Sequence, residues 1–346
     1  MTAQHRIAII GLGMALKPHL ASLEELSDRV EIAACYTPSA SRRQAFAAAH
    51  PYPTTGDLDR MLADPAIDIA LVLTPPGAHL DIVTRCAASR KHVLLEKPME
   101  ISAARGRDVV VAMERADRKF GVVFQHRFRA VSQRLAALVA AGSLGRLVSA
   151  SASIRWWRPP EYFAQPGRGM KARDGGGVLI TQAIHTLDLF QSLAGPIAAV
   201  TAIAATSPLR AIDTEDIVGA AIGFAGGAVG TIDATTVAYP GFPERIELAC
   251  ERATAVLQAE TLDVYFKDGT ELHEGGAASM TGGGGGADPM AFSHQAHKAL
   301  ITDFLDAVDA DRPPVVHGRE ALKVQVLIEA LLRSAAERRV VDVEAA

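Results

Sequence analysis

The chain has few cysteines, no block of charges of one sign and no apolar segment of membrane length. Its three cysteines, Cys35, Cys86 and Cys250, are odd in number and far apart, so they form neither a disulfide framework nor a metal-ligand pattern. The 35 basic and 39 acidic residues are interspersed, which gives no electrostatic footprint for nucleic acid or for an anionic membrane. No run approaches the roughly 20 apolar residues of a membrane span. These absences favour a cytoplasmic protein that acts on small molecules.

The sequence is long enough for two domains. It has 346 residues, 49% of them hydrophobic, and can bury a large core. In its first part, short β-branched runs alternate with alanine-rich helical segments, which is typical of βαβ units and a parallel sheet. Strands are expected at residues 6–10, 31–36, 67–73, 92–95 and 121–124, and helices at 39–50, 77–89 and 102–119. We therefore predict a doubly wound α/β domain over residues 1–124.

Residues 125–346 have a different pattern, with strand-like alternation of apolar and polar residues. Strands are expected at 147–154, 200–206, 218–224, 228–237, 246–249, 254–258 and 262–266, with one helix at 179–193. Two further helices, at 293–310 and 318–338, are candidates to pack back on the first domain. The segment 275–286 is too glycine-rich to hold one conformation by itself, so it is a surface loop or a lid. We predict an α+β second domain with a large, mainly antiparallel open sheet.

A glycine motif follows the first predicted strand. Gly11 and Gly13, with Met14 and Ala15 after them, stand where a dinucleotide pyrophosphate would rest on backbone N–H groups at the start of a helix. The third glycine of the usual G-x-G-x-x-G pattern is replaced by Leu16, and a purely structural turn is the alternative. The position within a βαβ unit favours the nucleotide.

The second predicted strand ends without the carboxylate that binds the ribose 2′-hydroxyl of NAD. Thr37, Ser39, Arg42 and Arg43 follow it instead, and a guanidinium can hold a 2′-phosphate in a bidentate fork. The alternative is that both arginines are ordinary solvated helix charges. We therefore predict a nicotinamide dinucleotide, with NADP preferred over NAD.

Two more loops follow predicted strands at the edge where open parallel sheets bind ligands. Thr74, Pro75 and His79 belong to one loop, and Glu96 and Lys97 belong to the other. All five are candidates for the cofactor site. Lys97 is either a catalytic ammonium or a charge that pairs with a carboxylate, and its local sequence does not decide between the two.

The predicted helix at 179–193 carries polar side chains at helical spacing. Thr181, His185 and Asp188 are spaced i, i+4 and i+7, so on an α-helix they share one face, and Gln182 lies next to them. A lone histidine on a helix is more often structural than catalytic. This face is nevertheless a candidate for binding substrate.

Taken together, these segments resemble the glucose-fructose oxidoreductase, inositol dehydrogenase and rhizopine-catabolism family, written Gfo/Idh/MocA. The likeness covers nearly the whole chain. It rests on GLG with His19 shortly after, TPPGAH at 74–79, EKP at 96–98, QHRF at 125–128, GGGVLITQAIHTLD at 175–188 and FLDAVDADRPPVVHGREALK at 304–323. Each motif alone is modest evidence, whereas their order and spacing are specific.

The resemblance implies a Rossmann domain followed by an α/β domain whose open sheet makes a homodimer or homotetramer. It places Lys97 beside the nicotinamide, with Gln125 also near the cofactor, and makes His185 the acid/base. Several sugar and cyclitol dehydrogenases of this family have aspartate where this chain has Thr181. That departure bears on the proton relay and on the hydroxyl pattern of the substrate.

Aromatic and cationic residues near the start of the second domain are further candidates. Trp157 offers a ring for stacking on a sugar, and Arg168 offers a guanidinium for a substrate carboxylate. Core packing is the alternative for one of the two adjacent tryptophans.

The leading hypothesis is an NAD(P)-dependent oxidoreductase that acts on a secondary alcohol or ketone of a sugar, cyclitol or related polyol, without a metal. One rival is a dihydrodiol dehydrogenase that acts on a non-carbohydrate cyclic diol. The other is a regulator that senses a dinucleotide without turnover. The presence of both Lys97 and His185 argues against this regulator.

Overall fold

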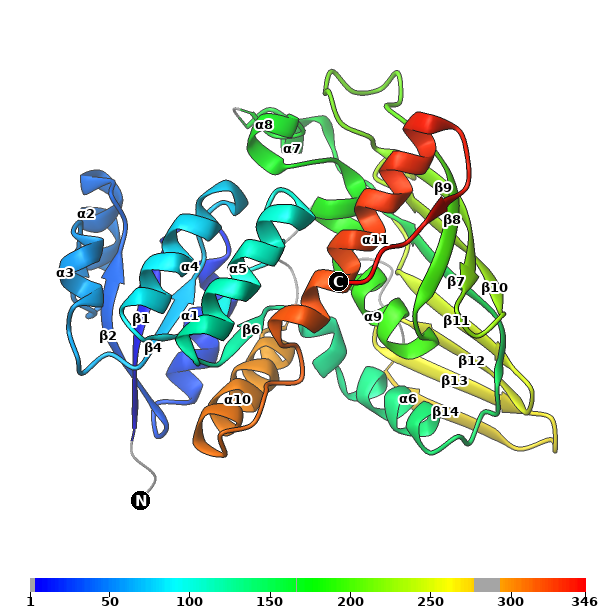
Figure 1. Ribbon diagram of the computed structural model, residues 1–346, viewed down its shortest axis with the longest axis horizontal. Helices are drawn as coiled ribbons and strands as arrows, with labels where there is room; N and C mark the ends of the chain where they lie inside the picture. The colour runs from blue at the N-terminus through cyan, green and yellow to red at the C-terminus, as the bar shows by residue number, and fades with distance from the viewer. Residues whose placement is uncertain (1–3, 166, 277–292) are drawn as a thin grey trace. The chain divides into compact units, whose positions relative to one another are not determined.

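The computed structural model describes residues 4–165, 167–276 and 293–346 (Figure 1). It divides the chain into two compact units. The first consists of the residues up to Gln125 together with Ser293–Leu322, and the second begins at His126 and includes Lys323–Ala346. Residues 277–286 of the glycine-rich segment lie outside the described residues. Among the helices described, none has the length and apolar character needed to cross a membrane.

The first unit contains a parallel sheet, as predicted, with six strands where five were expected. Its spatial order is β3-β2-β1-β4-β5-β6, the order of the doubly wound dinucleotide-binding fold. The strands are β1 (His5–Ile10), β2 (Val30–Tyr36), β3 (Thr54–Thr55), β4 (Ile69–Val72), β5 (His92–Leu95) and β6 (Phe120–Val122). All four residues of β4 are buried, as expected for a strand covered on both faces. The parallel arrangement brings the carboxyl ends of β1, β4 and β5 to one edge.

Helices complete the first unit. They are α1 (Leu16–Glu25), α2 (Ala40–Ala49), α3 (Leu58–Leu62), α4 (His79–Ala88), α5 (Ala103–Ala116) and α10 (Gln295–Asp309). Ser39, Asp57 and Ser102 cap the N-termini of α2, α3 and α5 with their side chains. Helix α10 packs against α1, although more than 250 residues separate them in sequence. Helix α11 (Gly318–Glu337) begins in this unit and ends in the second.

The second unit is built on a nine-stranded sheet, which confirms the predicted large, mainly antiparallel sheet. Its order is β14-β13-β12-β11-β7-β10-β9-β8-β15, and β7 and β10 are its one parallel pair of neighbours. The strands are β7 (Leu147–Arg155), β8 (Ile197–Ala205), β9 (Ile217–Phe224), β10 (Val229–Thr235), β11 (Arg245–Cys250), β12 (Ala253–Gln258), β13 (Thr261–Phe266), β14 (Glu271–Gly275) and β15 (Val341–Asp342).

The two faces of this sheet differ. Helices α6 (Ala130–Ala140) and α9 (Ile184–Ala194) lie on one face (Figure 1), where β7 buries Ala150, Ala152 and Ile154. On the other face, alternate residues are small or polar, interrupted by apolar side chains that are exposed. Among these, Ile203 is 79% exposed and Val229 is 63% exposed.

Candidate active site

The glycine motif forms a cradle at the end of β1. Gly11 has φ +110°, and a Cβ there would lie 2.8 Å from the carbonyl carbon of Leu73, so only glycine fits. A Cβ at Gly13 would meet no protein atom within 4 Å, which leaves space in front of the loop. Helix α1 follows without a side-chain cap. The space at Gly13, in front of the start of this helix, suits a pyrophosphate.

The loop after β2 is held by its own side chains. The Ser39 hydroxyl accepts a hydrogen bond from the Arg42 amide at 3.3 Å, and the Arg43 Nη1 donates to the Thr37 carbonyl oxygen at 2.7 Å. The Arg43 guanidinium is therefore already hydrogen-bonded to the backbone of this turn. Arg42 is exposed, so its guanidinium is the one available to a 2′-phosphate.

His79 joins the two loops that follow β4 and β5. The ring is 1% exposed, with Nε2 lying 2.7 Å from the Thr74 carbonyl oxygen and Nδ1 lying 3.0 Å from the Met99 carbonyl oxygen. Burial lowers the pKa of His79. Both ring nitrogens face backbone oxygens, so the side chain ties the loops together, whereas the sequence suggested a direct cofactor contact.

Several buried polar atoms in the first unit lack a hydrogen-bond partner within the described residues. Those that follow parallel strands at their carboxyl ends are the hydroxyl oxygen of Thr74 and the side-chain oxygen of Gln125. Buried polar atoms are normally satisfied, so an unpaired pair at the carboxyl ends of parallel strands fits a ligand that supplies the missing partners. Together with the cradle at Gly13, they fit a dinucleotide. Pro75 and Met14 are exposed at the same edge.

Glu96 and Lys97 follow β5. The Glu96 Oε2 accepts a hydrogen bond from the Lys97 amide at 2.8 Å, and the His19 Nε2 lies 3.0 Å from the Glu96 Oε1. His297 of α10 lies next to His19, and the three side chains offer nitrogen and oxygen atoms within 4.8 Å of one another. This is the spacing of a metal site, and each carboxylate oxygen also lies within hydrogen-bonding distance of a nitrogen of His19 or Lys97. The half-buried Lys97 follows directly.

In the second unit, glycines allow a close approach to Glu215. A Cβ at Gly177 would lie 1.8 Å from the Glu215 carbonyl oxygen. The Glu215 carboxylate accepts hydrogen bonds from the amides of Gly177 (3.1 Å) and Leu179 (3.2 Å). Burial raises the pKa of Glu215. This acid, which the sequence did not reveal, anchors the segment that leads to His185.

The expected single helix at 179–193 is two elements. A π-helical turn, η3 (Leu179–Ala183), precedes α9 (Ile184–Ala194), so the regular i, i+4 relation between Thr181 and His185 does not apply. The Thr181 hydroxyl lies 2.6 Å from the Gly177 carbonyl oxygen. Such π-helical turns occur frequently at functional sites.

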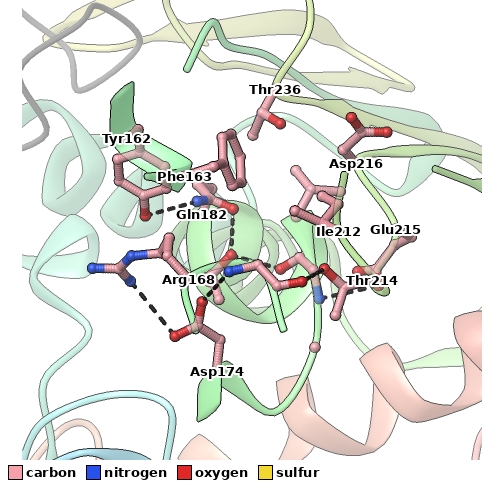
Figure 2. A pocket seen from close by; sticks show the side chains of 15 residues that line it. Tyr162, Phe163, Arg168, Asp174, Gln182, Ile212, Thr214, Glu215, Asp216 and Thr236 are labelled. Atoms are coloured by element: carbon pink, nitrogen blue, oxygen red, sulfur yellow. Dashed lines mark hydrogen bonds and ion pairs between the residues drawn. The ribbon is translucent and has the colours of Figure 1, made fainter. Parts of the chain in front are cut away.

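Thr181, Gln182 and Arg168 line one pocket (Figure 2). The Gln182 Nε2 donates to the Tyr162 hydroxyl at 3.1 Å, and Arg168 lies over the Tyr162 ring. The lining also includes Phe163, Asp174, Ile212, Thr214, Glu215, Asp216 and Thr236. Donors, acceptors and aromatic faces therefore meet at this pocket.

His185 and Asp188 lie outside the lining of this pocket. His185 is 7% exposed, and its ring lies against that of His126, with ring centroids 5.0 Å apart. Asp188 is 1% exposed and bound by Arg127. The expectation that Asp188 binds substrate is not supported by this geometry, because an ion pair occupies its carboxylate.

The two adjacent tryptophans separate into two roles. Trp156 is 5% exposed and belongs to the core. Trp157 is half-buried, with its ring edge against Tyr239 and the Arg210 guanidinium 5.0 Å from its ring centroid. Its face is thus covered at least in part by a cation of the chain itself. The alternation of inward and outward side chains on leaving β7 explains the division.

Both halves of the chain match known families. Residues 5–124 match the oxidoreductase family with an NAD-binding Rossmann fold, and residues 132–256 match the GFO/IDH/MocA C-terminal domain. The chain belongs to the Gfo/Idh/MocA family of oxidoreductases. A myo-inositol 2-dehydrogenase of Thermotoga maritima is 23% identical over 348 residues, which cover 98% of each chain.

Solved structures of Gfo/Idh/MocA proteins share this fold. The WlbA dehydrogenase from Bordetella pertussis, in complex with NADH and UDP-GlcNAcA, is 27% identical and superposes with a TM-score of 0.84 over 99% of both chains. A levoglucosan dehydrogenase in complex with NADH and levoglucosan gives a TM-score of 0.86 at 21% identity, over 99% of both chains. The dinucleotide in both of these structures is NADH.

Proposed function

We propose that this Gfo/Idh/MocA protein is an NAD(P)-dependent dehydrogenase that oxidises a secondary alcohol of a sugar, cyclitol or related polyol, or reduces the matching ketone. The match of both halves of the chain to this oxidoreductase family carries the proposal. The polar side chains and aromatic rings around Thr181, Gln182 and Tyr162 suit a ligand rich in hydroxyl groups. The sugar-like ligands of the two solved relatives support the same class.

The chemistry assigns separate tasks to two side chains. A bound nicotinamide would accept the hydride from the carbinol carbon. His185 would take the proton of the hydroxyl group, a task for which an imidazole is a common general base. The Lys97 ammonium would stabilise the charge that develops on the alkoxide oxygen. The Gly13 cradle, Thr74 and Gln125 would hold the dinucleotide.

The cofactor preference that we propose is NADP. It is supported by the hydroxyl of Ser39 and the exposed guanidinium of Arg42 after β2, where a carboxylate would favour NAD. The NADH in the solved relatives and the engagement of Arg43 with Thr37 count against it. Binding of both cofactors to the unmodified protein decides the matter.

Two other functions make different predictions. A dihydrodiol dehydrogenase would turn over cyclic diols that are not carbohydrates. A sensor would bind the dinucleotide and turn over neither class. A spectrophotometric screen of sugars, polyols and cyclic diols with NAD and NADP separates the three, because reduced nicotinamide forms only where the substrate fits. Turnover of diols alone would replace the polyol proposal, and binding without any turnover would favour the sensor.

We also propose that the protein is a cytoplasmic homodimer or homotetramer. The three cysteines are buried and free, which fits a reducing compartment. The exposed apolar residues on the uncovered face of the large sheet, among them Ile203 and Val229, would be buried by a second copy. Light scattering should return a multiple of the 36.5 kDa chain. Ile203→Glu should shift the protein towards monomer, and a monomeric unmodified protein would refute the assembly.

A further inference from the structure

We propose that His19 is a positioning residue for Lys97 and that it acts through the carboxylate of Glu96. This inference rests on the proposed catalytic role of Lys97. His19 lies on α1, behind the glycine cradle, and is fully buried. It is not itself assigned a contact with substrate or cofactor.

Glu96 is fixed from three directions. Its amide donates to the Val72 carbonyl oxygen at 2.9 Å, which extends the pairing of β5 with β4 by one residue. Its Oε1 lies 3.0 Å from the His19 Nε2, and its Oε2 accepts the Lys97 amide at 2.8 Å. The carboxylate therefore bridges α1 and the backbone of the proposed catalytic residue.

The direction of the His19 hydrogen bond follows from the ionisation of Glu96. Burial by itself raises the pKa of Glu96, but the His19 hydrogen bond and the charge of Lys97 outweigh burial and hold that pKa below its usual range. An ionised carboxylate is an acceptor only. With Glu96 ionised, His19 donates from Nε2 across the 3.0 Å contact.

His297 holds the His19 ring in place. The two rings meet edge to face, with centroids 5.1 Å apart and planes at 87°, and His297 is 2% exposed. Burial, together with the neighbouring His19, lowers the pKa of His297 to about 3, so its ring is neutral at physiological pH. Helix α10 thereby packs a buried, neutral ring against His19.

Loss of the His19 donor has a predictable effect on Lys97. The Glu96 carboxylate would keep its burial but lose one of its two N–H partners, and it would turn or take up a proton. The Lys97 amide would then lose a fixed acceptor. A displacement of about 1 Å at a catalytic group costs on the order of 10²-fold in rate.

The test compares His19→Leu with His19→Gln, because glutamine can place an amide N–H near the position of Nε2. His19→Leu should lower kcat by about 10²-fold without a change in the Kd of the dinucleotide. His19→Gln should stay within about tenfold of the unmodified enzyme. His294→Leu is the matched control, because it breaks the 2.7 Å His294–Glu25 pair at the exposed start of the same helix α10. It should leave kcat unchanged.

A second readout needs no substrate. In protein labelled with ¹⁵N-lysine, His19→Leu should speed hydrogen exchange of the Lys97 amide by about tenfold, because that amide loses its acceptor. His294→Leu should leave the rate unchanged. An unaltered Lys97 exchange rate in His19→Leu would overturn the inference, whether or not a substrate is known.

The double variant separates this inference from the proposed function. If His19 acts through Lys97, adding His19→Leu to Lys97→Met should cause no further loss of turnover. Losses that multiply would show that His19 acts elsewhere and would overturn the inference while leaving Lys97 catalytic. Near-normal turnover of Lys97→Met alone would instead refute the proposed role of Lys97.

Discussion

Arg127 binds Asp188 through two parallel hydrogen bonds, each 2.6 Å long, in the interior of the second unit. Breaking a buried pair leaves an uncompensated charge, which typically costs about 3–5 kcal/mol. We expect Asp188→Asn to lower the free energy of unfolding by that amount. Denaturation in urea measures the loss directly.

The matched control is Asp233→Asn, which breaks an ion pair of the same 2.6 Å length with Arg155 at a solvent-exposed position. It should cost less than about 1 kcal/mol. If Asp188 bound substrate, as its spacing from His185 suggested, its variant would raise KM and leave stability unchanged. That pattern would contradict the structural role assigned here.

The two glycines of the cradle should respond differently to alanine. Gly11→Ala forces a Cβ against Leu73 at a φ of +110°, so we expect a lower Tm. Gly13→Ala meets no protein atom, so we expect a normal Tm but weaker binding of the dinucleotide, because the methyl group enters the pyrophosphate space. Thermal melting and calorimetric titration of both variants provide the comparison. If a folded Gly13→Ala protein binds the dinucleotide with unchanged affinity, the pyrophosphate does not bind at this loop.

The sequence predicted most of the long, strongly patterned elements of the fold but missed helix α6 and strand β14. Strand β5 lies at the predicted residues, and the apolar alternation of β7 and β9 was sufficient to place them. The two-residue strands β3 and β15 were missed, because pairing with a neighbour rather than any local pattern defines them. The π-helical turn was missed for a similar reason. Its geometry depends on Glu215, which lies about 35 residues further along the chain.

A local motif was enough to predict the glycine loop of the site. Contacts between side chains that are far apart in the sequence were harder to predict. The glycine motif implied the cradle that Gly11 and Gly13 form. Sequence spacing did not reveal the ion pair between Arg127 and Asp188 or the contact between the His126 and His185 rings. Helix α6 and strand β7 lie between these residues along the chain. Such pairs are decided by tertiary packing.

The cofactor preference should depend on Arg42 more than on Arg43. A charge-assisted hydrogen bond to a 2′-phosphate is worth about 1.5–3 kcal/mol, so Arg42→Ala should reduce the preference for NADP by about tenfold or more. Arg43→Ala should change it less, because that guanidinium is bonded to Thr37. Calorimetry with both cofactors measures the effect. Equal affinities for NADP and NAD in the unmodified protein would refute the NADP assignment.

Stability should depend on pH through His297, which is buried, and His92, which is half-buried. Burial lowers the pKa of His297 to about 3 and that of His92 to about 4. In the unfolded chain both titrate near 6.5. Below that pH the unfolded state binds more protons than the folded state, so stability is fully present above pH 6.5 and is lost as pH falls towards 4.

Each of these histidines should contribute a slope of about 1.4 kcal/mol per pH unit within that window. Urea denaturation between pH 7 and about pH 5 measures the slope. His297→Gln and His92→Gln should each make it shallower, even if they also lower stability overall. An unaltered slope in both variants would mean that other groups control the acid sensitivity.

The most direct test of the proposed function measures turnover by Lys97→Met, His185→Asn and the double variant, with a substrate found in the screen. Each single variant should lower kcat by about 10²–10⁴-fold while the dinucleotide still binds. The double variant should be little worse than the poorer single one, because residues that act as a unit are not additive. In the unmodified enzyme kcat/KM for oxidation should rise with pH as the base loses its proton. This rise with pH should be absent in His185→Asn. Near-normal turnover in both single variants would contradict the account.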